Sequence, residues 1–158
     1  MAQNRNLRAF MRESAKTEKI IKVPGPAFIQ EDGKPVTFEV KVLNADTLRK
    51  INEKYQTQEV ALDPKGNPYI HKGELVYSSQ FDAHKASAHI LVEALIHPNL
   101  KDSELMQYFD CVDVTEMPTK VFPTIKEFEA VNTLVLKAIG LRDGDKPSDA
   151  EDLEEAKN

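Results

Sequence analysis

His89, Glu93 and His97 stand four residues apart and would share one side of a helix. Imidazole and carboxylate groups are ligand types that zinc accepts. The same line continues toward the N-terminus through Asp82 and Lys85, however, which is the pattern of a solvent-facing stripe on a mostly buried helix. The spacing also lacks the HExxH order of zinc enzymes, and no cysteine supports it. We therefore assign no metal and no cofactor to this stripe.

The rest of the sequence contains no recognisable catalytic motif. The GxSxG, Walker, GxGxxG and CxxC patterns do not occur. No motif around His71 or His84 indicates a catalytic or metal-binding role for either residue. Because no convergent set of reactive groups can be located, the sequence predicts a protein that is not an enzyme and has no catalytic residue.

Charge is distributed unevenly along the 158 residues, whose net charge is −5. Residues 1–22 carry six basic and two acidic side chains, and residues 142–158 carry three basic and seven acidic ones. The basic segment has only Phe10 as an aromatic residue, so it gives little support to nucleic-acid binding.

The single cysteine, Cys111, excludes an intrachain disulfide and fits a reducing cytosol. No apolar run is long enough to span a bilayer, and we expect no membrane partner.

The segment 79–100 contains the most apolar helix pattern of the sequence. Apolar residues surround Glu93 on most sides, which is typical of a helix in the middle of a core. They are Ile90, Leu91, Val92, Ala94, Leu95 and Ile96. Ser79 and Asp82 predict a capping box at the start of this helix, and the proline after His97 predicts its end.

Residues 36–42 alternate between apolar and polar side chains, which predicts a strand with one buried face. Residues 27–30 are its expected partner, joined to it by a tight turn at Asp32-Gly33. A helix capped by Asn44 or Asp46 should follow and run to about residue 56.

The segment 59–78 is rich in turn signals, and part of it, residues 69–77, could form a small hairpin around Lys72-Gly73. Beyond the central helix, Asp102 should cap a short helix. Thr124 and Glu127 predict a capping box at the start of a last helix, which Gly140 should stop.

These elements predict an α+β fold, in which a small N-terminal β-hairpin packs with a mainly α-helical C-terminal part around one buried central helix. Residues 26–141 should form this single domain, and residues 142–158 an acidic disordered tail. Residues 1–25 form a basic N-terminal segment that could include a short helix. Leu7, Phe10 and Met11 would lie on one side of that helix. These three residues either contact a partner or dock on the domain's own core.

Two pieces of the sequence resemble a known family. They are the stretch DGKPVTFEVKVLNADTLRKI and the stretch ALIHPNLKDSEL, followed by a terminal helix that ends in Ile139-Gly140. Together they are similar to the XkdN-like tail assembly chaperones of tailed phages and prophages, over residues 28–141. The matching residues are packing and turn residues.

The resemblance implies a non-enzymatic assembly factor of the host cytoplasm that is absent from the mature virion. It implies binding to the tape measure protein, which such chaperones keep soluble while tail tube subunits polymerise around it. Self-association along this client is a further expectation. Two alternatives remain open: a structural tail or connector component of the virion, and a nucleic-acid-binding accessory protein that acts through the basic N-terminus.

Overall fold

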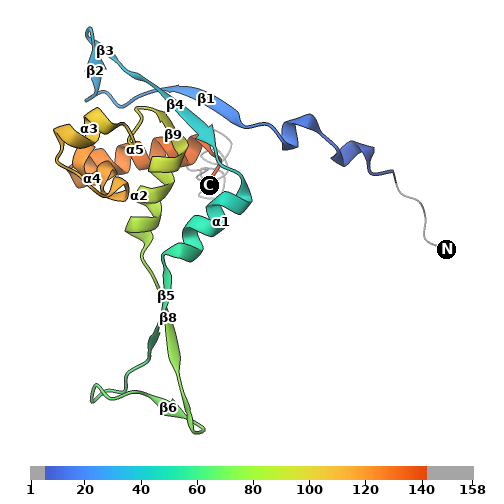
Figure 1. The fold of residues 1–158 in the computed structure, drawn as a ribbon, viewed down its shortest axis with the longest axis vertical. Helices are drawn as coiled ribbons and strands as arrows, with labels where there is room; N and C mark the ends of the chain where they lie inside the picture. Colours follow the sequence, from blue (N-terminus) through green and yellow to red (C-terminus); the bar gives the residue numbers. More distant parts are fainter. Residues whose placement is uncertain (1–5, 142–158) are drawn as a thin grey trace, which may run out of the picture.

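The computed structural model describes residues 6–141; residues 1–5 and 142–158 lie outside the described part. The acidic tail predicted for residues 142–158 therefore lies outside it as well. Figure 1 shows a body of helices and one sheet from which three segments project: residues 6–18, the hairpin β2–β3, and a long ribbon formed by β5 and β8. Within residues 6–141, no helix has the length and apolarity needed to cross a lipid bilayer.

Helix α2 (Ala83–Ala94) lies at the centre of the body, and the predicted buried central helix is confirmed. Six of its residues are buried: Ala86, Ala88, Ile90, Leu91, Val92 and Ala94. It packs against α1 (Ala45–Lys54), β4 (Thr37–Val42), η3 (Val114–Glu116), α4 (Met117–Val121) and α5 (Ile125–Ala138). Because neighbours lie on several sides, apolar residues cover most of the circumference in the second half of the helix.

Both predicted ends of the central helix are wrong. Its N-cap is Asp82, whose side chain accepts a hydrogen bond of 3.0 Å from the Lys85 backbone N–H. Ser79 lies instead in strand β8 (Tyr77–Phe81), where pairing with β5 (Gln56–Val60) fixes its backbone. At the other end the helix stops at Ala94, and the next three residues form β9 (Leu95–His97) along the edge of β4. Strand pairing of the flanking residues therefore determines both where the helix begins and where it ends.

The sheet of the body has the antiparallel order β1–β4–β9. The predicted alternation in β4 is confirmed, since Phe38 and Val40 are fully buried. Its partner is β1 (Lys19–Pro24) and not residues 27–30. Strand β1 sets Ile21 opposite Val40 over a register of six residues, whereas residues 27–30 contribute only to the short β2 (Gln30–Glu31). The longer ladder is favoured, and it leaves Ile21 and Val23 of β1 half-buried.

The remaining cap and turn predictions are confirmed. The pair β2–β3, with β3 at Lys34–Pro35, turns at Asp32-Gly33, and both turn residues have positive φ. Of the two candidate caps of α1, Asn44 is the N-cap and Asp46 lies in the first turn, and Asp102 caps α3 (Ser103–Tyr108). A full capping box opens α5, where the Glu127 N–H donates to Thr124 Oγ1 at 3.1 Å.

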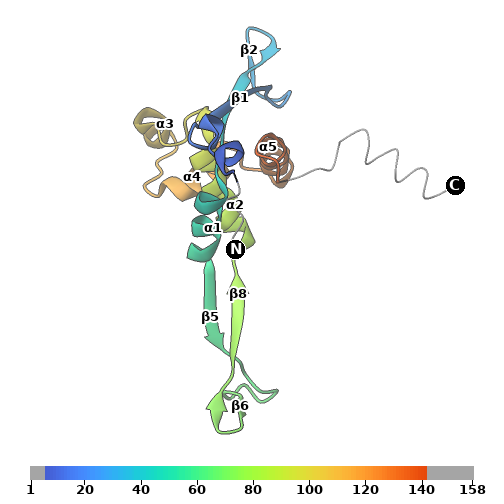
Figure 2. The ribbon, with the colours of Figure 1, turned by 90° about the vertical axis from the view of Figure 1, so that its right-hand side faces the viewer.

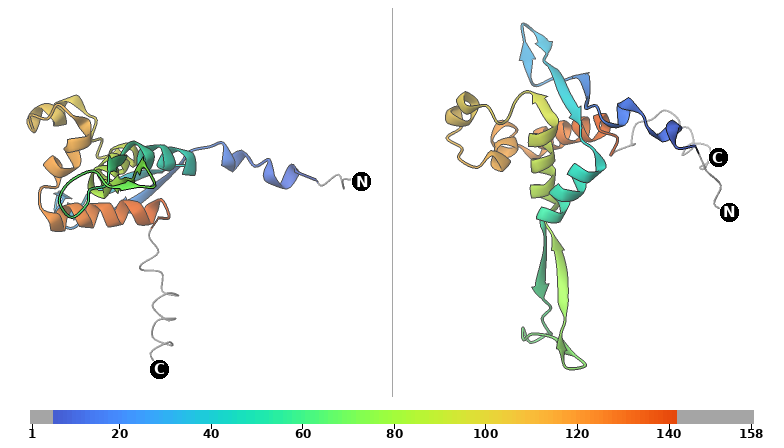
Figure 3. Two further views of the ribbon diagram at one scale, coloured as in Figure 1. Left: turned by 90° about the horizontal axis from the view of Figure 1, so that it is seen from below. Right: turned by 45° about the vertical axis from the view of Figure 1, so that its right-hand side comes forward.

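A two-stranded ribbon, residues 56–81, projects from the body and is named the arm below (Figure 2). Strands β5 and β8 pair antiparallel along its stem. Near its end, β6 (Ile70–His71) and β7 (Glu74–Leu75) form the predicted small hairpin around Lys72-Gly73. No residue of the arm is buried. The turn-rich stretch of the sequence is therefore an ordered projection, which the views of Figure 3 show from two further directions.

Candidate functional site

The three residues of the candidate metal stripe are separated by the fold. His97 leaves the helix on strand β9, where it lies opposite Glu39 of β4. His89 and Glu93 stay on α2, with His89 Nε2 3.8 Å from Glu93 Oε1. Glu93 is held by Lys101, whose Nζ lies 3.1 Å from the same oxygen. Among residues 6–141 no group of three or more His, Cys, Asp or Glu side chains could hold a metal ion.

His89 has a structural partner in Tyr55. The Tyr55 hydroxyl lies 2.8 Å from His89 Nδ1, and the two rings meet edge to face. Burial lowers the pKa of His89 below its usual value, and the positive charge of Lys54 adds to this effect, while Glu93 opposes it. Burial also raises the pKa of Tyr55. A neutral imidazole that accepts from the tyrosine hydroxyl and turns its N–H toward Glu93 fits this arrangement.

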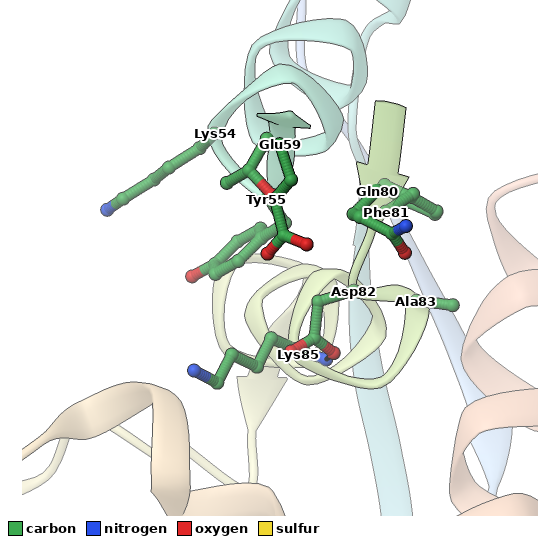
Figure 4. Close-up of a pocket in the computed structure, with 9 residues that line it drawn as sticks. Lys54, Tyr55, Glu59, Gln80, Phe81, Asp82, Ala83 and Lys85 are labelled. Atoms are coloured by element: carbon green, nitrogen blue, oxygen red, sulfur yellow. Dashed lines mark hydrogen bonds between the residues drawn. The ribbon is translucent and has the colours of Figure 1, made fainter. Parts of the chain in front are cut away.

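A shallow pocket of about 610 Å³ lies where the arm joins the body. Figure 4 shows its lining: Lys54 and Tyr55 from the end of α1, and Phe81, Asp82 and Lys85 from the arm and the start of α2. Glu59 and Gln80 of the arm complete one side. The lining mixes both signs of charge, and the Asp82 carboxylate is already used as the cap of α2.

A second pocket of about 480 Å³ shares Lys54, Tyr55 and Lys85 with the first and extends to Asp113. Hydrogen bonds from the side chain and backbone of Thr115 lower the pKa of the Asp113 carboxyl. That carboxylate is thereby committed to the turn before η3. The Asp82 and Asp113 carboxylates of the two pockets are thus held in a helix cap and a turn.

The predicted partner-contacting residues lie on the N-terminal segment, far from the core. Leu7, Phe10 and Met11 are 59%, 75% and 74% exposed. This segment forms two 3₁₀ turns, η1 (Arg8–Phe10) and η2 (Glu13–Ala15), in place of one continuous α-helix. A helix of about ten residues without a buried face is marginal in water, which explains the difference. Two backbone bonds hold η1: Phe10 N–H to Leu7 O and Met11 N–H to Arg8 O.

The arm carries a second set of exposed apolar side chains, which the sequence did not single out. They are Leu62, Tyr69, Ile70, Leu75, Tyr77 and Phe81.

On the stem the register sets Phe81 opposite Gln56 and Tyr77 opposite Val60, so these four side chains share one face of the ribbon. Thr57, Glu59, Ser78 and Gln80 form the other face. The signal in the sequence was weak, because within residues 77–81 only Tyr77 and Phe81 are apolar and three polar residues separate them.

The chain is similar to one protein family in sequence and to a solved structure in fold. A sequence model of the family described as "Phage XkdN-like tail assembly chaperone protein, TAC" matches residues 7–157. No curated protein matches significantly. Among solved structures, the chain is similar to the crystal structure of the protein yqbn, with a TM-score of 0.57 and 17% sequence identity. That similarity covers 79% of this chain and 87% of the other, and at this identity it shows a shared fold.

Proposed function

Because the chain belongs to the XkdN-like family of phage tail assembly chaperones, we propose that it binds the tape measure protein of its phage. In this proposal it keeps that client soluble and assists polymerisation of the tail tube around it. It acts in the host cytoplasm, carries out no catalytic step, self-associates along the client and is absent from the finished particle. The match of the family over residues 7–157 is the observation that carries the proposal.

Two features of the described residues support a role in binding. The N-terminal segment exposes Leu7, Phe10 and Met11, and the arm exposes aromatic and aliphatic side chains along its whole length. Contiguous exposed apolar surface on a protein in water is typical of sites that bind other proteins. A long client rich in apolar helix faces would cover such surface, as amphipathic helices do when they lie on apolar grooves.

Co-expression with the tape measure protein tests the proposal. We expect the client to remain in the soluble fraction with this chain and to precipitate without it, and an affinity tag on the chain should recover the client. A client that precipitates equally in both cases would contradict chaperone activity. A lysate that contains an unrelated soluble protein in place of the chain controls for expression level.

The particle itself separates a chaperone from a virion component. Mass spectrometry of purified virions should find no peptide of this chain. Stoichiometric recovery would instead make it a structural tail or connector component. In the affinity-tag experiment, recovery of tail tube subunits without the tape measure protein would also indicate a structural virion component.

A further inference from the structure

Strand β8 presents an open edge of the arm that is free of charge. Its five residues, Tyr77 to Phe81, include no Lys, Arg, Asp, Glu, Pro or Gly. In the described residues β8 pairs only with β5, so its other edge has no strand beside it. One edge strand of the body sheet, β1, is different, since it carries Lys19, Lys22 and Pro24. Lysine and proline are the residues with which proteins commonly prevent pairing at an edge, and β8 lacks both.

The backbone groups on this edge can be assigned from the bonds at the two ends of the stem. The Ala61 N–H donates to the Val76 carbonyl at 2.8 Å, and the Asp82 N–H donates to the Tyr55 carbonyl at 3.1 Å. Hydrogen-bonded positions alternate along an antiparallel ladder. Ser78 and Gln80 therefore face β5, whereas the N–H and C=O groups of Tyr77, Ser79 and Phe81 point outward from the free edge.

The arm has little to stabilise it as an isolated ribbon. None of residues 56–81 is buried, and a two-stranded hairpin is at best marginally stable in water, whereas three or more strands with an apolar face can stand alone. A further strand beside the stem would bring the ribbon to that number.

We propose that β8 pairs antiparallel with β8 of a second copy of this chain, about a two-fold axis at Ser79. In this register Ser79 lies opposite Ser79 of the second copy, and Tyr77 lies opposite its Phe81. All the outward backbone groups then meet as hydrogen-bonded pairs. The two arms become one four-stranded sheet, and the contact is self-complementary, as a two-fold interface requires.

Side chains also fit this register. Residues directly opposite one another in an antiparallel pair lie on the same face, so Tyr77 and Phe81 of the two copies form two cross-strand aromatic pairs. Ser78 lies opposite Gln80 on the polar face. No charge faces a like charge across the contact, because the strand contains none. The same pairing through β5 would bring two Glu59 side chains to adjacent positions, which is why we assign the interface to β8.

A disulfide across the axis tests the register. The Cα atoms of a hydrogen-bonded antiparallel pair are about 5.5 Å apart, within the range of about 4.4–6.8 Å that a disulfide spans. We expect Ser79→Cys to give a covalent dimer under mild oxidation and Ser78→Cys to give much less, because Ser78 faces Gln80. The native Cys111 is buried, so the parent chain should stay uncrosslinked. Equal crosslinking of both variants, or of neither, would overturn the register.

A proline on each edge tests which strand forms the contact. Ser79→Pro removes an outward N–H without breaking the ladder to β5, since proline is tolerated at an edge position of this kind. Gln58→Pro makes the matched change on β5, because Gln58 lies opposite Ser79 and also faces outward. By analytical ultracentrifugation we expect Ser79→Pro to raise the dimer dissociation constant at least about tenfold, the change that follows from losing roughly one or two hydrogen bonds. Gln58→Pro should leave that constant within about twofold.

These experiments use the chain alone, so they are independent of the proposed client. A parent chain that sediments as a monomer up to its solubility limit would overturn the proposal. The reverse order of the two proline variants would overturn it as well. Circular dichroism of each variant confirms that the body remains folded.

Discussion

Phe10 is the most exposed apolar side chain of the N-terminal segment, and the fold gives it no part in the core. Phe10→Ala should therefore change the free energy of unfolding by less than about 0.5 kcal/mol. If the segment contacts the client, as we propose, the same change should weaken client capture several-fold in a pull-down from co-expressing cells, because exposed aromatic side chains commonly dominate binding energy.

Ile125→Ala is the matched control for Phe10→Ala. Ile125 is 85% exposed and lies at the start of α5, away from the N-terminal segment. It should affect neither stability nor capture. A loss of stability in Phe10→Ala with normal capture would indicate that the segment docks on the domain itself.

His89 should make stability depend on pH as the pH falls below the ordinary histidine pKa of 6.5. Its pKa in the folded chain is lowered from the ordinary value of 6.5, mainly by burial and then by Lys54 and Lys101, against the opposing effect of Glu93 and Asp113. Over the interval between the two pKa values the unfolded chain binds more protons, so stability rises with pH there. The contribution of His89 is complete above pH 6.5 and is lost as the pH falls toward the lowered pKa.

Urea unfolding at a series of pH values measures this effect. His89→Gln should flatten the change in unfolding free energy between pH 7 and pH 5, and His71→Gln, on the exposed arm, should leave it unchanged. An unaltered slope in His89→Gln would show that other groups cause the pH dependence.

At the scale of elements, the junction between β1 and β4 leaves no room for a side chain at Gly25. A Cβ atom there would meet the Val36 backbone carbonyl oxygen first and would lie 2.8 Å from a ring carbon of Phe38, while the Gly25 N–H donates to the same carbonyl at 2.8 Å. Gly25→Ala should therefore cost about 1–3 kcal/mol through overpacking, measured by urea unfolding. Ala27→Ser, at an exposed position two residues further on, should cost less than about 0.5 kcal/mol. Similar effects of both changes would mean that the Val36 backbone and Phe38 shift to admit the methyl group without penalty.

At the scale of the whole molecule, body and arm should be separable. The arm contributes no buried residue, so replacing residues 60–77 by Asn-Gly should leave the body folded. Glu59 and Ser78, which are in register, would then close a two-residue turn. At low concentration we expect the shortened chain to match the full chain in midpoint of thermal unfolding, measured by circular dichroism. At high concentration it should remain monomeric.

A large drop in the unfolding midpoint of the shortened chain would contradict this separation and indicate that the arm supports the body. Retained client capture by the shortened chain would place the client on the N-terminal segment. Lost capture would place it on the arm. The same variant thus separates the two candidate binding surfaces.

The sequence by itself determined the features that depend on near neighbours in the chain. The apolar pattern of residues 90–96 predicted a buried central helix, because only a helix with neighbours on several sides favours so few polar residues. Asn44, Asp102 and the pair of Thr124 and Glu127 predicted their caps correctly, because a cap bond joins residues three apart.

Only the tertiary structure decided the features that depend on competition between distant segments. Strand β4 pairs with residues 19–24 and not with the nearer 27–30, and β9 ends the central helix early, because each pairing depends on area buried against the whole body. The exposure of the arm also could not be predicted from the sequence. Tyr77 and Phe81 are residue types that favour half-buried strands, and only the fold shows that both stay exposed among residues 6–141.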